Sequence, residues 1–190
     1  MKITRKTNET DILLESSEVT RINTGVPMFD HFMSQFFKGL GTPFTLIIQG
    51  DLEIDAHHSL EDAGYVIGRL IKMQYEEEQV MRYGSLIQVM DDAALEMAID
   101  LSGRSTLVLC DFDDMMLSYG GLAWDDLREF LHAMVREGAM TLHVRKLRGE
   151  SAHHICEALF KGLGRLLAQA LSPANQPLST KGRVSWEVTP

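Results

Sequence analysis

Several features are scarce or missing in this chain of 190 residues. No uninterrupted apolar run approaches the roughly 18 residues of a membrane-spanning helix, so we expect no membrane insertion. The chain has two cysteines, Cys110 and Cys156, and no CxxC motif. A disulfide framework and a thiolate zinc site are therefore not expected, and both cysteines are predicted to be small buried apolar residues.

Positive charge is also scarce, because 18 Lys and Arg face 27 Asp and Glu, for a net charge of −9. This balance argues against nucleic-acid binding, which needs a basic surface for phosphates. It still allows a small anionic ligand to be held by a few local cations. The first residues, "MKITRKTNET", lack the apolar core of a signal peptide. A cytoplasmic protein is predicted, or one that resides in an organelle after processing.

The chain repeats itself. "AHHSLE" begins at Ala56 and "AHHICE" begins at Ala152, a spacing of 96 residues. The same spacing without gaps aligns Thr10 with Thr106, Gly25 with Gly121, Asp30 with Asp126 and the two "GRL" segments at 68–70 and 164–166. Matches spread over most of both halves indicate a duplicated unit. We expect a first half at 1–81 and a second at 82–190, packed together as one compact body.

Hydrophobic periodicity predicts an α/β protein of the α+β type with two pseudo-symmetric halves. Apolar residues at three- and four-residue spacing predict helices over 28–37, 57–75, 124–137 and 153–170. Strands are predicted over 10–19, 43–50, 106–114 and 139–146, with further strands in 82–101.

The duplicated HHxxE motif has metal-ligating chemistry. On a helix, Glu61 shares a face with both His57 and His58, whereas the two imidazoles point about 100° apart. One ion cannot easily accept both, so two ions are predicted, each taking one histidine of each pair. Nitrogen and carboxylate ligands without thiolate suit Mn, Fe, Zn or Ni. Asp55 and Asp62 are predicted to orient the imidazoles. The alternative is a solvated polar helix start with a capping aspartate.

Other residues in the chain are further candidates for a metal or phosphate site. His31 on an apolar helix face and His143 on a strand are ordinarily core histidines, but near four metal-suited histidines both become candidate ligands. His132 is interpreted as structural. Lys161 lies four residues after Glu157 and shares its helix face. Ser179, Lys181 and the backbone around Gly182 could cradle a phosphate, as could Arg82 and Arg104.

Together these motifs closely resemble the imidazoleglycerol-phosphate dehydratase family. The matching segments occur in the family's order and span almost the whole chain: "RKTNET" (5–10), "TGVPMFDHFM" (24–33), "GDLEIDAHHSLEDAG" (50–64), "RYG" (82–84), "MDDA" (90–93), "DLSGR" (100–104), "TLHV" (141–144), "HHICEALFK" (153–161) and "STKG" (179–182).

The resemblance implies a lyase of histidine biosynthesis that converts imidazole glycerol phosphate to imidazole acetol phosphate by removing water. It implies two divalent ions, usually Mn²⁺, and helices packed between two sheets. It also implies a homo-oligomeric cage of 24 copies with metal sites between subunits. The implied metal ligands are His31, His57, His58, Glu61, His143, His153, His154 and Glu157. Glu9 matches the acidic residue for proton transfer, and Gln35, Arg82, Arg104, Lys161, Ser179 and Lys181 match substrate and phosphate contacts.

The sequence departs from the family at a few positions. Gly39 stands where the family has a histidine eight residues after the "DH" histidine, and Asp92 stands where glutamate is usual. These departures leave two alternatives open. One is a degenerate metal-binding homologue with little turnover, and the other is a related metal-dependent enzyme acting on another phosphate ester.

Overall fold

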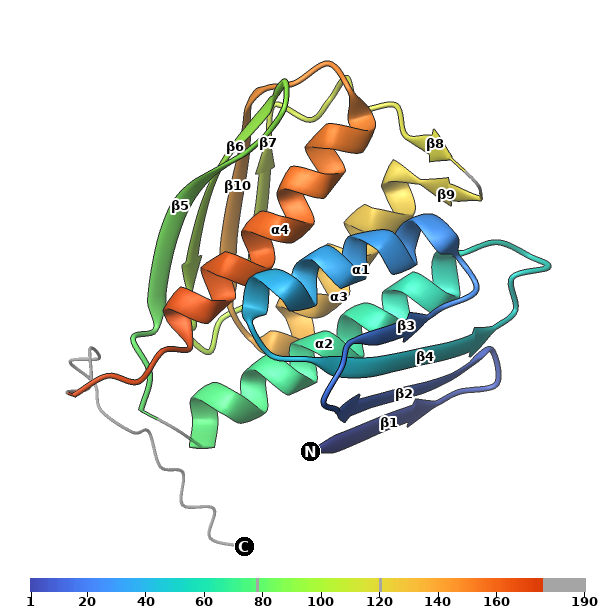
Figure 1. Cartoon of the computed structure of the whole chain (residues 1–190), viewed down its shortest axis with the longest axis horizontal. Coiled ribbons are helices and arrows are strands. Elements are labelled where there is room, and N and C mark those ends of the chain that lie inside the picture. The colour runs from blue at the N-terminus through green and yellow to red at the C-terminus, as the bar shows by residue number, and fades with distance from the viewer. Residues whose placement is uncertain (78, 120, 176–190) are drawn as a thin grey trace, which may run out of the picture.

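A computed structural model describes residues 1–77, 79–119 and 121–175 of the chain (Figure 1). The candidate phosphate contacts Ser179 and Lys181 lie outside this part. Within the described ranges, no helix combines the length and apolar character needed to cross a membrane.

Two four-stranded sheets form the outer layers of the molecule (Figure 1). The first has the order β1 (Lys2–Lys6), β2 (Thr10–Ser16), β4 (Phe44–Gly50) and β3 (Arg21–Asn23). The second has the order β5 (Tyr83–Met90), β6 (Ala93–Asp100), β10 (Thr141–Arg148) and β7 (Thr106–Cys110). In each sheet only the last strand named runs parallel to its neighbour. A short hairpin, β8 (Ser118–Tyr119) and β9 (Leu122–Ala123), lies apart from both.

Four helices fill the space between the sheets (Figure 1): α1 (Pro27–Leu40), α2 (His57–Glu77), α3 (Trp124–Gly138) and α4 (Ala152–Ala170). They pack across the two halves, α1 on α4 and α2 on α3. Phe29, Phe130 and Phe160 meet at the centre, with ring centroids 5.4–6.1 Å apart. The predicted fold class, with two pseudo-symmetric halves and helices between two sheets, is confirmed.

The repeat residues in front of α1 and α3 are helix-start signals. Gly25 and Gly121 adopt positive φ angles of 77° and 81°, a conformation that favours glycine. Asp30 then accepts hydrogen bonds from the backbone N–H and hydroxyl of Thr24, at 2.8 and 2.6 Å. Asp126 likewise accepts one from the backbone N–H of Ala123, at 2.8 Å. The sequence matches at these positions therefore have a structural cause.

The predicted alignment of Thr10 with Thr106 is wrong. Sheet order makes β2 the counterpart of β6, whereas Thr106 begins β7, the counterpart of β3. Residues 111–123 separate β7 from α3, but only residues 24–26 separate β3 from α1. This extra segment shifts the spacing of the first three strands, so a spacing of 96 residues relates the halves only from Gly25, just before α1, onward.

The two cysteines differ in environment. Cys156 is buried on α4, as predicted, and burial raises the pKa of its thiol to about 12. The prediction for Cys110 is wrong, because its side chain is exposed. Cys110 ends an edge strand opposite Arg145 and shares the outer face of the second sheet with it. The alternation of strand side chains therefore directs it away from the helices.

The crossing of α1 and α4 depends on two glycines. A Cβ atom on Gly39 would lie 2.8 Å from the carbonyl oxygen of Lys161, and one on Gly164 would collide with that of Phe36. The missing side chains let the two helix backbones approach closely. A side chain at position 39 would force the helices apart, so the Gly39 departure is tied to the close approach of these two helices.

Candidate metal centre

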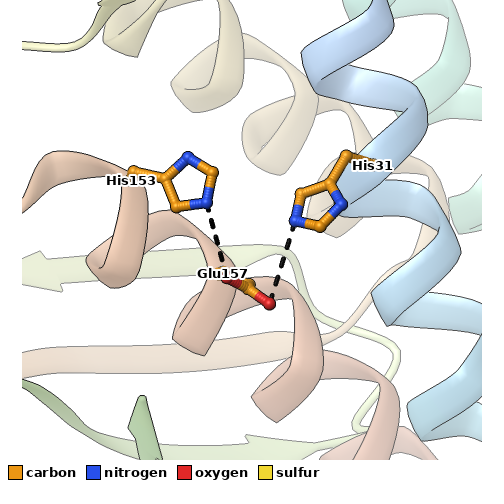
Figure 2. A group of neighbouring side chains, drawn as sticks. All are labelled: His31, His153 and Glu157. Carbon is orange, nitrogen blue, oxygen red and sulfur yellow. Dashed lines mark ion pairs between the residues drawn. The ribbon is translucent and has the colours of Figure 1, made fainter. Parts of the chain in front are cut away.

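His31, His153 and Glu157 converge between α1 and α4 (Figure 2). Glu157 Oε1 lies 3.8 Å from His31 Nε2, and Glu157 Oε2 lies 3.5 Å from His153 Nε2. One ligand atom from each of the three residues lies within 4.8 Å of the others. His153 and Glu157 share a face of α4 because they are four residues apart, and the close helix crossing brings His31 opposite them.

The chemistry of this group fits a divalent ion. His31 Nε2 is buried, and no hydrogen-bond partner for it exists in the described part of the chain. Burial of Glu157 opposes its ionisation, but the bond from Lys161 Nζ at 2.6 Å and the neighbouring positive charges outweigh it, and the pKa lies below its ordinary value. An ionised carboxylate with two imidazole nitrogens suits Mn, Fe, Zn or Ni.

The second histidine of each pair is held by an aspartate. His58 Nδ1 lies 2.9 Å from Asp51 Oδ2, and His154 Nδ1 lies 2.5 Å from Asp92 Oδ1. These bonds raise the pKa of both imidazoles. With Nδ1 occupied by a carboxylate, each ring has Nε2 available as the ligand atom, which is how metal-binding histidines are commonly oriented.

The predicted orienting roles of Asp55 and Asp62 are wrong. Asp55 accepts a hydrogen bond from the backbone N–H of His57 at 2.9 Å, and so caps the start of α2. Asp62 instead binds Arg5 and the hydroxyl of Thr10. The residues that do contact imidazoles, Asp51 and Asp92, lie 7 and 62 residues from their histidines along the chain.

Adjacent imidazoles point in different directions in both copies of the motif. The ring planes of His57 and His58 meet at 79°, and those of His153 and His154 at 81°. His57, His58 and Glu61 lie at the start of α2. In residues 1–77, 79–119 and 121–175, the only group of three or more metal-suited residues is the one around Glu157.

The duplication does not extend to every candidate ligand. At the spacing of 96 residues, the counterpart of His31 is the buried Leu127, and that of His143 is Ile47. His143 lies on the outer face of the second sheet beside Arg145, away from the helix layer. His132 on α3 is half-buried and belongs to no such group. The candidate ligands outside the HHxxE motifs therefore differ between the two halves.

The other predicted site residues lie in three places. Arg82 binds Asp100 through Nε at 2.6 Å and Nη2 at 3.1 Å, and Arg104 reaches the same carboxylate at 3.7 Å. The two arginines thus meet at one aspartate. Glu9 lies in the loop between β1 and β2, with Oε1 3.9 Å from His58 Nε2. Gln35 lies half-buried on α1, four residues after His31.

A family model described as imidazoleglycerol-phosphate dehydratase matches residues 24–167, which include α1, α2, α3, most of α4 and all eight candidate ligands. The chain belongs to this family. Three imidazoleglycerol-phosphate dehydratases illustrate the similarity. That of Acetivibrio thermocellus is 40% identical over 95% of this chain and 96% of its own. Those of Moorella thermoacetica and Campylobacter fetus are 39% and 41% identical, over 96% and 94% of this chain and 97% and 96% of their own.

Solved structures of family members share the fold. The enzyme of Pyrococcus furiosus, crystallised with a compound called (S)-C348, superimposes with a TM-score of 0.85 at 34% identity, over 96% of this chain and 100% of its own. That of Staphylococcus aureus gives a TM-score of 0.79 at 29% identity, over 92% and 99% of the two chains. The family likeness therefore covers the sequence and the three-dimensional arrangement alike.

Proposed function

We propose that this family member removes water from imidazoleglycerol phosphate in histidine biosynthesis, and that it does so with two divalent ions, Mn²⁺ being the expected metal. Membership of a dehydratase family supports the reaction. The convergence of His31, His153 and Glu157 is the observation that supports a metal-dependent form of it.

The proposed ligands are the four HH histidines with the two glutamates of the same motifs, together with His31 and His143. A bound divalent ion supplies Lewis-acid activation of the substrate's imidazole ring. Residues of the chain itself orient these ligands. The aspartate partners of His58 and His154 keep Nε2 of each ring directed outward, so that these ligands need no reorientation when an ion binds.

Glu9 is the proposed proton-transfer residue. Its side chain is 54% exposed and lies beside His58, so a carboxylate reaches both solvent and a proposed ligand, as a general acid–base requires. Arg82, Arg104, Lys161, Ser179 and Lys181 are the proposed phosphate contacts, and Gln35 a further substrate contact. A phosphate remote from the reacting carbons supplies binding energy and orientation.

We propose that the working enzyme is a cytoplasmic homo-oligomer, a cage of 24 copies with its metal sites between subunits. Two features support an assembly. His143 lies on an outer sheet face, separate from the three ligands around Glu157 in the described chain. The same face exposes Ile87 and Val89 of β5 to 61% and 62%. A second copy covering this face would bury apolar surface. The division at 81/82 is proposed as the boundary of the two halves.

The direct test is an assay of acetol-phosphate formation by metal-stripped protein, with and without added Mn²⁺. Activity should depend on the metal and should be lost in Glu9→Gln down to a small residual kcat, at least about 10²-fold below the wild type, while that variant keeps its metal. Bound ions without turnover would instead favour the degenerate homologue that the Gly39 departure suggests. If the protein converts a different phosphate ester and not imidazoleglycerol phosphate, the alternative of a related metal-dependent enzyme would be favoured.

A further inference from the structure

A buried polar network joins the loop that carries Glu9 to helix α2. Arg5 donates to Asp62 Oδ1 from Nε at 2.8 Å and from Nη2 at 2.6 Å. The hydroxyl of Thr10 donates to the other oxygen, Oδ2. Asp62 and Thr10 are only 5% and 3% exposed, and the Arg5 guanidinium lies 4.8 Å from the centre of the Tyr65 ring. Both oxygens of one buried carboxylate therefore hold residues that flank Glu9.

The loop itself is closed by Thr7. Its hydroxyl accepts hydrogen bonds from the backbone N–H groups of Glu9 and Thr10, at 3.1 and 3.0 Å, and lies 3.2 Å from the Thr10 hydroxyl. The backbone N–H of Thr7 donates to the Thr10 carbonyl at 2.9 Å. Through Thr10, Asp62 thus fixes the turn on which the Glu9 side chain is mounted.

Strand pairing identifies the counterparts of the network in the second half. Thr10 pairs with Gly50 of β4, and Leu95 pairs with Lys146, which follows Gly50 by 96 residues. The same comparison gives Leu86 for Arg5, and the helix spacing gives Ala158 for Asp62. All three counterparts are apolar, and Leu95 and Ala158 are fully buried.

The second half therefore packs the corresponding strand pair, β5 and β6, on the corresponding helix, α4, without the polar network. Even a fully buried ion pair often adds little stability compared with apolar residues of similar size, because its charges lose their hydration. This pair is only partly buried, since the Arg5 side chain is 38% exposed. The second half shows that this type of strand–helix contact can form with apolar residues in place of Arg5, Thr10 and Asp62.

The turn between β5 and β6 also carries an acidic residue beside a histidine, with Asp91 Oδ2 3.5 Å from His154 Nε2. The first half differs in that its loop carries Glu9, the proposed proton-transfer residue, and is held by this network.

We propose that Asp62, acting through Arg5 and Thr10, is a positioning residue that holds the Glu9 carboxylate at its working place beside His58. This inference rests on the proposed function. The residue type fits the role, because a carboxylate offers acceptors on both oxygens and can bind the two sides of one loop at once. A hydrophobic contact has no such directionality.

The primary test is Thr10→Val, which removes one hydroxyl, keeps the shape of the side chain and leaves α2 unchanged. We expect kcat to fall at least about tenfold, but by no more than the about 10²–10⁴-fold that acid–base catalysis contributes. KM should change by less than about threefold, and the metal content should stay the same. Thr10→Ser, which keeps the hydroxyl, should recover most of the lost kcat.

The matched control is Asp11→Asn on the same hairpin. It removes the exposed ion pair between Asp11 Oδ2 and Lys6 Nζ, and it should leave kcat unchanged. Should Thr10→Val impair folding, Arg5→Lys keeps the charge but cannot place two N–H donors on one oxygen, and the same loss of kcat is expected from it.

A mutant cycle separates positioning from a general structural role. In the Glu9→Gln background, Thr10→Val should lower the residual kcat by less than about twofold, because the group it positions is already gone. The proposal is overturned if Thr10→Val lowers kcat by the same factor in the Glu9→Gln background as in the wild type. It is also overturned if Thr10→Val and Asp11→Asn have equal kcat. A wild-type protein without dehydratase activity would contradict the proposed function instead.

Discussion

At the scale of single residues, the molecule pairs histidines of its HHxxE motifs with aspartates, His58 with Asp51 and His154 with Asp92. Asp92 accepts from His154 and also from the backbone N–H groups of Glu150 and Ser151. The His154 bond first, and then these backbone bonds, hold the pKa of Asp92 well below its ordinary value. The charged aspartate in turn raises the pKa of His154. The pair is thus fully charged above the titration of Asp92 and below that of His154.

This pair has a pH dependence that can be measured without metal. Its contribution to stability is lost as pH falls through the lowered pKa of Asp92 and as pH rises through the raised pKa of His154. In a proton NMR titration of the metal-free protein, the His154 ring should titrate above 6.5, and Asp92→Asn should return it toward 6.5. Asp55→Asn, which removes one negative charge at the start of α2 in the other half, is the control and should leave the pKa of His154 unchanged.

Removing the central carboxylate tests the metal centre directly. Glu157→Gln should weaken Mn²⁺ binding at least about tenfold, since even outer contacts of metal ligands contribute about 10–100-fold. Calorimetric titration of metal-stripped protein measures the change. Glu150→Gln makes the same substitution at an exposed loop residue and should bind Mn²⁺ like the wild type. Equal affinities for the two variants would remove Glu157 from the ligand set.

At the scale of elements, the helix crossings give a matched pair of mutations. Ala at Gly164 would collide with the backbone of α1, and Ala at Gly68 would place its Cβ 2.5 Å from the Met134 carbonyl of α3. Overpacking of this kind costs about 1–3 kcal/mol, so both variants should melt at lower temperature than the wild type.

The group of His31, His153 and Glu157 lies at the crossing of α1 and α4, which contains Gly164. Gly164→Ala should therefore also weaken Mn²⁺ binding, because it moves His31 away from α4. Gly68→Ala should weaken binding less, because α3 has Leu127 at the counterpart of His31. Calorimetry beside thermal unfolding separates the two effects. Equal losses of affinity would show that helix spacing does not control this site.

At the scale of the whole molecule, assembly should depend on the outer face of the second sheet. Ile87→Glu places a charge on the exposed β5 residue and should reduce the particle mass seen by light scattering. Val19→Glu is the control, because Val19 is 63% exposed but follows β2 in the first half. Chelation of the wild type should also lower the mass if ions bridge subunits. A chain that stays monomeric with its ions bound would contradict the proposed cage.

Local patterns predicted a large part of this molecule. The helices and most strands follow from periodicity within single segments, and the duplicated HHxxE motif identified His153 and Glu157 as ligand candidates. Long-range pairings were not predictable in the same way. Asp92 reaches His154 across 62 residues, and no spacing rule relates them. The extra segment at 111–123 likewise misplaced the strand alignment, because a gapless comparison cannot detect an insertion. The role of Gly39 appears only once α4 is packed against it.

The cross-packing of the helices has a consequence for the origin of the fold. Because α1 corresponds to α3 and α2 to α4, both helix pairs join the first helix of one half to the second helix of the other. This is the arrangement of an isologous dimer, in which one surface meets itself about a two-fold axis. An ancestor of half this length could have built the same core by pairing two separate chains. Within a single chain the two copies can differ in sequence, and they do: His31 in the first half has Leu127 as its counterpart, and His143 in the second half has Ile47.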